Sequence, residues 1–238
     1  MEDYRKMPGE RKKRVATADV MLLLGPEYGP FEWEPRFAPA SELVYTILSQ
    51  HTSDINSERA FKNLMATFGS LEDIASAPVG DIEDAIRMGG LAKVKAPRIK
   101  AVLNQIFEEL GSFDLMFLKD MSLDEAKAWL KRLDGIGPKT AAIILCFSLG
   151  MPAMPVDTHI YRVSQRLGFV GKKISVEKAH DILEAKVEPE DVFDFHLYLI
   201  NHGRQVCKAL RPRCGRCVLA WGCPSRAAFE RKAKKKGK

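Results

Sequence analysis

Four cysteines near the end of the sequence have the spacing of a metal site. Cys207, Cys214, Cys217 and Cys223 follow the pattern C-x6-C-x2-C-x5-C and are four of the five cysteines in the chain. Four thiolates within 17 residues can close around one metal centre, and chance would rarely cluster them so tightly. Coordination chemistry alone does not choose the metal, because structural zinc also accepts four thiolates.

A glycine-rich turn followed by a lysine is the second chemical signal. Gly135, Ile136 and Gly137 separate two predicted helices, and the second helix begins with Pro138, which suits the first helical position. The glycines let the backbone turn sharply, and the free N–H groups of the turn and the helix start make a phosphate site. Lys139 follows in the first turn of that helix. On the glycines alone, an ordinary helix–turn–helix connection remains an alternative.

Asp157 stands directly before a predicted helix at Thr158–Leu167, and two roles are open to it. Its carboxylate could cap the helix by accepting a hydrogen bond from a backbone N–H. A carboxylate held rigidly in this way could also stabilise positive charge on a substrate and accept a proton. The two roles are compatible.

Together these segments resemble the endonuclease III family of helix-hairpin-helix DNA glycosylases. Residues 133–141 nearly match the family motif Leu-Pro-Gly-Val-Gly-x-Lys-Thr-Ala, and Val156–His159 matches its Val-Asp-Thr-His signature. The cysteine spacing is similar to the family's [4Fe–4S] motif, and the resemblance runs from about Glu42 to Pro224. It implies a [4Fe–4S] cluster on the four cysteines, and double-stranded DNA with a damaged base or an abasic site as the partner.

The resemblance implies a bifunctional DNA glycosylase and AP lyase of base excision repair, acting on oxidised pyrimidines. Lys139 would attack the C1′ carbon of the sugar as a neutral amine, displace the base and form a Schiff base. β-Elimination would then cut the strand 3′ to the abasic site. The helix dipole and partial burial of Lys139 are expected to favour the neutral amine. Asp157 would be the catalytic carboxylate.

Two loops match positions at which the family enters the DNA base stack. Gln50 and His51 lie where relatives carry one glutamine. Strict alignment places His51 there, and which of the two fills the gap is left open. Leu91 matches an apolar wedge, although it could also make an ordinary contact at a helix cap. Asp54 could cap a helix or line the active site.

The loop between the first two cysteines carries three cations. Lys208, Arg211 and Arg213 could be held against the DNA backbone by a cluster that stiffens this loop. Alternatively, these three side chains are ordinary charged residues of a solvated loop.

Three further residues have structural interpretations. His202 matches a family position near the cluster, and we expect a structural role for it. His159 is expected to pack or to form hydrogen bonds rather than to catalyse. Cys146 lies in an apolar segment and is expected to be a small buried hydrophobe.

Two rival functions are considered. The first is a glycosylase of the same fold that removes a base with water. Adenine-mismatch glycosylases of this kind carry a glutamate where this chain has Thr46 and lack the lysine, so Thr46 and Lys139 both argue against it. The second is a non-catalytic DNA-binding module with a zinc knot, which would be colourless and would form no covalent adduct. Plant 5-methylcytosine glycosylases share a pattern like Gln50–Asp54, so unusual base preferences stay open.

Helical patterns dominate the sequence around these residues, and no segment alternates with the period of a strand, so the fold class is all-α. Two helical lobes are expected: residues 40–149 as a six-helix barrel with the hairpin, and residues 1–39 with 150–226 as an iron–sulfur cluster domain. Residues 227–238 are expected to be a basic flexible tail. The expected helices are Ala16–Leu24, Ser41–Leu48, Ser57–Phe68, Ser70–Ala77, Asp81–Met88, Ala96–Leu110 and Ser122–Leu133.

The composition fits a soluble globular protein, with 46% hydrophobic and 29% charged residues among 238. The net charge is +6, of which +5 falls in the last nine residues, so the rest of the chain is nearly neutral. Such a tail either solubilises the chain or attracts phosphate. The N-terminal residues do not resemble a signal peptide, and the longest apolar run, residues 140–156, is too interrupted to span a membrane. We therefore expect a cytoplasmic monomer that associates with the nucleoid through DNA, with no membrane contact.

Overall fold

The fold consists of helices throughout the part of the chain that the structure describes. The computed structural model describes residues 14–236, and none of these residues forms a β-strand. The predicted all-α class is therefore confirmed. Within the same residues, no helix is both long and apolar enough to cross a membrane.

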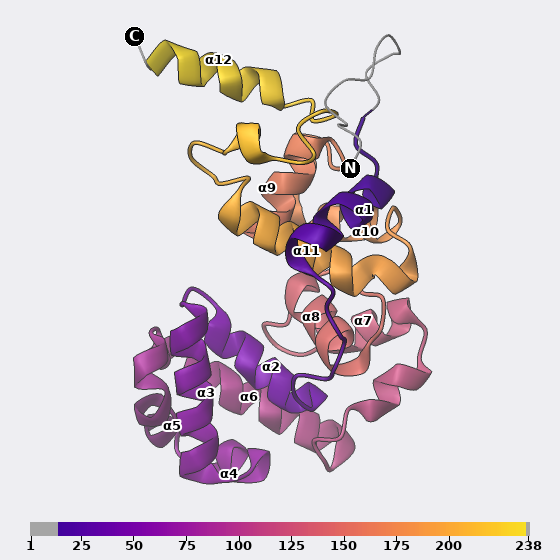
Figure 1. Ribbon diagram of the computed structural model, residues 1–238. Helices are drawn as coiled ribbons and strands as arrows, with labels where there is room; N and C mark the ends of the chain where they lie inside the picture. The colour runs from indigo at the N-terminus through magenta and orange to yellow at the C-terminus, as the bar shows by residue number, and fades with distance from the viewer. Residues whose placement is uncertain (1–13, 237–238) are drawn as a thin grey trace. The chain divides into compact units, whose positions relative to one another are not determined.

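The chain divides into two compact units (Figure 1). One unit, here called the hairpin unit, is formed by Trp33–Ala153. The other, the cysteine unit, combines the N-terminal segment up to Glu32 with the chain from Met154 onward. The hairpin unit is wider than the predicted range 40–149. Its extra N-terminal residues are tied to α8, because the Trp33 indole Nε1 donates to the carbonyl oxygen of Cys146 at 2.8 Å.

The hairpin unit is built around one buried helix, α8. This helix packs against α2 and α7, while α6 packs against α2, α4 and α5 (Figure 1). Apolar side chains from all of these helices form one continuous core. The second helix of the predicted hairpin is therefore packed into the core of its unit. The helices are α2 (Pro39–Ser49), α3 (Asp54–Phe68), α4 (Leu71–Ser76), α5 (Val79–Ile86), α6 (Ala92–Leu110), α7 (Leu123–Lys131) and α8 (Pro138–Leu149), with the 3-10 turns η1 (Arg87–Gly89) and η2 (Met116–Asp120).

An ion pair between a partly exposed arginine and a buried carboxylate holds the start of α2. Glu42 is fully buried, and its carboxylate accepts hydrogen bonds from the Arg36 guanidinium and the Thr46 hydroxyl. Burial raises the pKa of Glu42, and the hydrogen bonds and charge of Arg36 oppose that rise. The guanidinium also lies over the rings of Tyr45 and Phe147. Thr46 is thus part of a structural network of the core.

The cysteine unit is organised by α11, which packs against α1 and α9 (Figure 1). Its fully buried apolar side chains include Phe195 and Leu199 of α11, Ile160 and Val163 of α9, and Leu24 of α1. Its helices are α1 (Thr17–Tyr28), α9 (Thr158–Leu167), α10 (Val176–Glu184), α11 (Val192–Gln205) and α12 (Arg226–Lys236), with the 3-10 turns η3 (Pro189–Asp191) and η4 (Cys214–Arg216).

Four helices of the hairpin unit begin earlier than predicted, and one of them is α5, which begins at Val79 and not at Asp81. The predicted start of α3 at Ser57 was wrong, because Ser53 is its N-cap and accepts a hydrogen bond from the backbone N–H three residues on, at 3.3 Å. Asp54 is therefore the first helical residue and not the cap. The helix α2 begins at Pro39 rather than Ser41, since proline fits the first turn of a helix without losing a hydrogen bond.

The helix α6 also starts one turn before its predicted first residue, Ala96. It begins at Ala92, because the Leu91 carbonyl oxygen accepts hydrogen bonds from the backbone N–H groups of Val94 at 2.9 Å and Lys95 at 3.0 Å. Pro97 lies inside the helix and removes only one donor. A proline so near the start of a helix of this length is tolerated.

The two ends of the described chain are more helical than predicted. The helix α1 continues through Pro26 to Tyr28, past its predicted end at Leu24. Residues 227–238 were predicted to be a flexible tail, whereas α12 covers Arg226–Lys236. The pair of Arg226 with Glu230, one turn apart, supports the first turns of this helix.

Candidate active site and cysteine cavity

The glycine turn exposes the start of α8. It follows α7, which ends at Lys131, earlier than predicted. Gly135 has a φ of +74°, and a β-carbon there would clash with the Arg98 guanidinium. Ile136 is only 5% exposed and anchors the turn in the core. Gly137 is the N-cap of α8, and within the described residues no side chain caps this helix. Its first N–H groups can therefore bind an anion such as phosphate.

The turn is held in place from α6. The side chain of Gln105 accepts a hydrogen bond from the backbone N–H of Asp134 at 3.0 Å and donates one to the carbonyl oxygen of Arg132 at 3.2 Å. Both partners lie between the end of α7 and the glycine turn. One side chain of α6 thus holds the segment that leads into the turn.

Lys139 is the second residue of α8, directly after Pro138 at the predicted first position. Its side chain is exposed, so the partial burial predicted for it was wrong. The buried neighbours Ile136 and Thr140 face the core, which leaves Lys139 on the solvent side of the helix start. An exposed amine beside an open helix start can reach a phosphodiester substrate bound at the turn.

Asp157 is the N-cap of α9, and this predicted role is confirmed. Its Oδ1 accepts a hydrogen bond from the backbone N–H three residues further along, at 2.7 Å. Two buried histidines hold the segment before it: the Nδ1 atoms of His180 and His196 lie 2.8 and 2.9 Å from the carbonyl oxygens of Met154 and Pro155. Because a carbonyl oxygen only accepts, both Nδ1 atoms are the donors. The carboxylate is therefore fixed on both sides.

The predicted DNA-probing residue Gln50 follows α2 as its C-cap. Its Oε1 accepts a hydrogen bond from Nη1 of Arg98 at 2.9 Å. The next residue, His51, is exposed and has a φ of +54°. The two candidates for the gap-filling role therefore differ in their surroundings.

The predicted wedge, Leu91, stands immediately before α6 with 53% of its surface exposed. Its φ is +53°, and Gly90 before it also has a positive φ. Lys95 is buried, and its Nζ donates to the carbonyl oxygens of Leu48 at 2.6 Å and Gly89 at 3.1 Å. Burial lowers the pKa of Lys95. This lysine ties the end of α2 to the loop that carries Leu91.

Backbone strain coincides with the predicted DNA contacts. Among the residues described, the non-glycine residues with positive φ are His51, Leu91 and Arg211. All three were predicted from the sequence to touch DNA. A left-handed backbone costs a bulky residue on the order of 1–3 kcal/mol and persists where function requires it.

In the cysteine unit, α9 supports the loop between the first two cysteines. Arg162 donates to the carbonyl oxygen of Cys207 at 3.1 Å. Arg166 donates to the carbonyl oxygens of Lys208 at 2.7 Å and Ala209 at 3.0 Å. The helix that begins at the Asp157 cap thus also holds the loop with the predicted DNA-contacting cations. His159 hydrogen bonds to Arg162, as predicted for a non-catalytic histidine.

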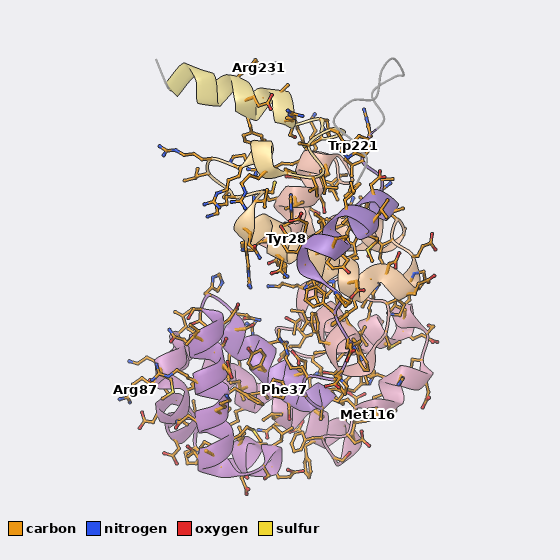
Figure 2. The ribbon with its side chains drawn as sticks, viewed as in Figure 1. Tyr28, Phe37, Arg87, Met116, Trp221 and Arg231 are labelled. Carbon is orange, nitrogen blue, oxygen red and sulfur yellow. The ribbon has the colours of Figure 1, made fainter. Side chains whose placement is uncertain are left out.

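The four cysteines line a single cavity of about 30 Å³. His202 is buried beside it, with Nε2 3.4 Å from the Cys217 sulfur and Nδ1 3.3 Å from the hydroxyl of Tyr28, which Figure 2 labels. Nη1 of Arg166 lies 3.4 Å from the Cys207 sulfur. The fifth cysteine, Cys146, is buried in the core of the hairpin unit, as predicted.

The chemistry of this cavity suits a positively charged metal centre. Burial, together with the neighbouring thiols, raises the pKa of Cys217 to about 12. Burial likewise raises the pKa of Cys214 and Cys223, and nearby thiols add to both effects. A metal would bind these thiols as thiolates, and their protons would be released on binding. In the described part of the chain, no three His, Cys, Asp or Glu side chains form a group around a single metal ion.

A basic groove adjoins the cysteine loop. It has a volume of about 410 Å³, and four cations line it: Arg204, Lys208, Arg213 and Arg216. Arg211 is exposed in the same loop. Lys208 and Arg213 were predicted DNA contacts, whereas no motif in the sequence pointed to Arg204 or Arg216. The groove offers the charge that a phosphate backbone requires.

Comparison with known proteins shows that the chain is similar to DNA repair enzymes. The sequence pattern of the HhH-GPD superfamily base excision DNA repair proteins matches residues 44–189, more than half of the chain. Endonuclease III of Synechocystis is 34% identical over 229 residues, which are 94% of this chain and 97% of that enzyme. The chain belongs to the endonuclease III family.

Two further proteins are similar to this member of the endonuclease III family. A putative DNA glycosylase of Arabidopsis thaliana is 41% identical over 162 residues, which are 68% of this chain and 55% of the plant protein. A structure of endonuclease III trapped as a covalent intermediate with DNA superposes with a TM-score of 0.75 at 26% identity. That match covers 90% of this chain and 95% of the other.

Several residues that build the endonuclease III family site were missed from the sequence. They are charged or polar side chains inside amphipathic helices: Lys95, Arg98, Arg162, Arg166 and His196. On a helix such residues are first taken for the solvent face. Their partners are backbone atoms or side chains far along the chain, so no local motif could have found them.

Proposed function

We propose that this protein is a bifunctional DNA glycosylase and AP lyase of base excision repair. Its substrate would be double-stranded DNA with an oxidised pyrimidine or an abasic site. The observation that carries the proposal is the exposed Lys139 beside the uncapped start of α8, directly after the glycine turn. A cytoplasmic, DNA-associated monomer is part of the proposal.

The reaction follows from the groups at the helix start. The N–H groups of the turn and of α8 bind a phosphate of the damaged strand. The Lys139 nitrogen forms a bond to C1′ of the sugar, while the bond from C1′ to the base breaks and the base leaves with its electron pair and a proton. Opening of the sugar ring gives the Schiff base. Loss of a proton from C2′ then expels the 3′ phosphate and cuts the strand.

Asp157 is the proposed partner of the lysine. Because its carboxylate is held by the cap of α9 and by the segment before it, its position is set before substrate binds. It would accept a proton from the amine of Lys139 and stabilise positive charge on the sugar. Capping occupies one carboxylate oxygen, so the other can serve this role.

We further propose that Cys207, Cys214, Cys217 and Cys223 hold a [4Fe–4S] cluster. Four thiols around one cavity provide the donor set that such a cluster requires. The cluster would supply structure: it would cross-link the loop and hold Lys208, Arg211 and Arg213 toward the DNA backbone. The basic groove beside the loop would contribute to the same non-specific attraction.

The test is a pair of assays on one purified protein. Duplexes that contain thymine glycol or an abasic site are incubated with it, and base release and strand cleavage are measured, with and without borohydride. We expect release of the base, a nick 3′ to the lesion and a borohydride-stable covalent adduct. Base release without adduct or nick would favour a water-using glycosylase, and binding alone would favour a non-catalytic module.

Replacing Leu91 with glycine should show whether its side chain is needed for excision without weakening the fold. Glycine removes the exposed side chain and relieves the positive φ, so the free energy of unfolding should stay the same or rise. Excision of thymine glycol should nevertheless fall about tenfold, because the apolar wedge no longer enters the opened base stack. The comparison is Met116→Gly, which removes another exposed apolar side chain of the same unit (labelled in Figure 2). Equal losses in the two variants would rule out a wedge.

Replacing Cys217 with serine should remove the cluster. The wild-type protein is expected to be brown and to carry about four iron atoms per chain, and Cys217→Ser should lose most of both. Cys146→Ala is the matched control, because that cysteine lies in the core of the other unit, and it should keep the colour. Iron, sulfide and zinc analysis with visible absorption decides the question. Zinc in place of iron in the wild type would contradict the assignment.

A further inference from the structure

The helix α12 carries a concentrated positive charge. Between Arg226 and Lys236 the sequence has six cationic residues and a single acidic one, Glu230. Like charges one turn apart repel each other in a helix, and a helix of this length is barely stable alone in water. The helical state of α12 therefore depends on contacts with the rest of the cysteine unit or with an anion.

One aromatic side chain ties α12 to the cysteine unit. The guanidinium of Arg166, on α9, lies 4.5 Å from the centre of the Phe229 ring. Phe229 is half-buried and lines the cysteine cavity, whereas the residues on either side of it, 227–228 and 230–231, are exposed. The helix also packs against η4 (Figure 1). The first turns of α12 are thus docked on the unit.

The arginine under Phe229 also orders the cationic loop between the first two cysteines. Its guanidinium donates to the carbonyl oxygens of Lys208 at 2.7 Å and Ala209 at 3.0 Å. On the other side of α12, η4 includes Arg216, which lines the basic groove. The charge of α12 therefore continues the charge of the loop and of the groove.

We infer that α12 is a further DNA-binding element, which binds backbone phosphates of the duplex next to those bound by the cysteine loop. The inference rests on the proposed function for its partner, double-stranded DNA. Phe229 is a positioning residue: its ring on Arg166 sets the direction of the helix and so the place of its cations, among them the exposed Arg231 (labelled in Figure 2). Phosphate binding in turn relieves the repulsion among these cations.

The first experiment measures how many phosphates α12 contacts. Affinity for an undamaged duplex is titrated at several salt concentrations, because each phosphate contact adds about 0.9 to the slope of log affinity against log salt. Ending the chain after Ser225 should lower the slope by about three, the contribution of about half of the cations in α12, and should weaken binding at least about tenfold at physiological salt.

Pairs of lysines separate the charge of α12 from the charge of the whole unit. Lys234→Gln combined with Lys235→Gln should lower the slope by about one to two. The matched control combines Lys178→Gln with Lys186→Gln, which removes two exposed lysines elsewhere in the same unit. It should change the slope by less than about 0.5, since these lysines belong to neither α12 nor the cysteine loop.

Substitutions of Phe229 test the docking, because they leave every charge in place. Phe229→Ala should lower the slope by about one or more, whereas Phe229→Tyr keeps the ring on Arg166 and should bind like wild type. Phe229→Leu still covers the cysteine cavity but lacks the ring, and should match Phe229→Ala with the iron content of wild type. Val176→Ala removes another exposed apolar side chain of the unit and should change nothing.

Two results would overturn the inference. An unchanged slope after removal of α12 would mean that the helix does not bind DNA. Wild-type binding by Phe229→Ala and Phe229→Leu, with weakened binding by the α12 lysine variant, would mean that the segment acts as an undocked polycation. The proposed function fails separately: a wild type whose slope depends on α12, but which releases no base and forms no borohydride adduct, would contradict that function and leave the inference intact.

Discussion

Lys139→Ala is expected to abolish the borohydride-trapped adduct and to slow strand cleavage by at least about a thousandfold, as loss of a covalent nucleophile does. Affinity for a tetrahydrofuran duplex should stay within about threefold of wild type, because the N–H groups of the hairpin that bind phosphate are unchanged. Trapping gels, single-turnover cleavage and a binding titration measure the three quantities. The variant should also unfold like wild type, since the side chain is exposed.

The matched control for this lysine is Lys131→Ala. Lys131 is also exposed and lies on the other arm of the hairpin, at the end of α7. The Lys131→Ala variant should form the trapped adduct and cut the strand like the wild type, because Lys131 does not lie at the start of α8. Normal trapping by Lys139→Ala would mean that another amine is the nucleophile.

Asp157→Asn should separate catalysis from helix capping. Asparagine caps helices about as well as aspartate, so the free energy of unfolding should change by less than about 0.5 kcal/mol. Excision should fall about a hundredfold or more, because an amide neither accepts a proton from the lysine nor balances charge on the sugar. Asp157→Ala should lose the same activity and in addition about 1 kcal/mol of stability. Denaturant unfolding and single-turnover excision give both numbers.

Ser175→Ala provides the comparison for the stability effect. Ser175 caps α10 by accepting a hydrogen bond from the backbone N–H of Lys178 at 3.3 Å, as Asp157 does for α9. Its loss should cost about 1 kcal/mol without reducing excision. If Asp157→Asn excised normally, the carboxylate would be only a cap.

The parts of the site that the sequence predicted correctly are those with local causes. Pro138 starts α8, and Asp157 caps the helix Thr158–Leu167, because a proline at a helix start and a capping carboxylate act within one turn. The four cysteines share a cavity because their spacing is short.

The parts that could not be predicted depend on contacts between distant segments. The bond from Arg98 to Gln50 joins residues 48 positions apart, and the one from Lys95 to Leu48 joins residues 47 apart. Neither bond is indicated by the sequence of either segment alone. The exposure of Lys139 was missed for a related reason: the helix start projects from its core, and a sequence pattern gives the helix but not the depth at which it is buried.

Formation of the Schiff base by Lys139 is tested by locating the trapped adduct. Wild-type protein is reduced with borohydride on a duplex with an abasic site, digested with a protease and a nuclease, and analysed by mass spectrometry. We expect the sugar remnant on the peptide that contains Lys139, and on that residue. An adduct on another lysine or on the N-terminal amine, or no adduct while the strand is still cut, would contradict it.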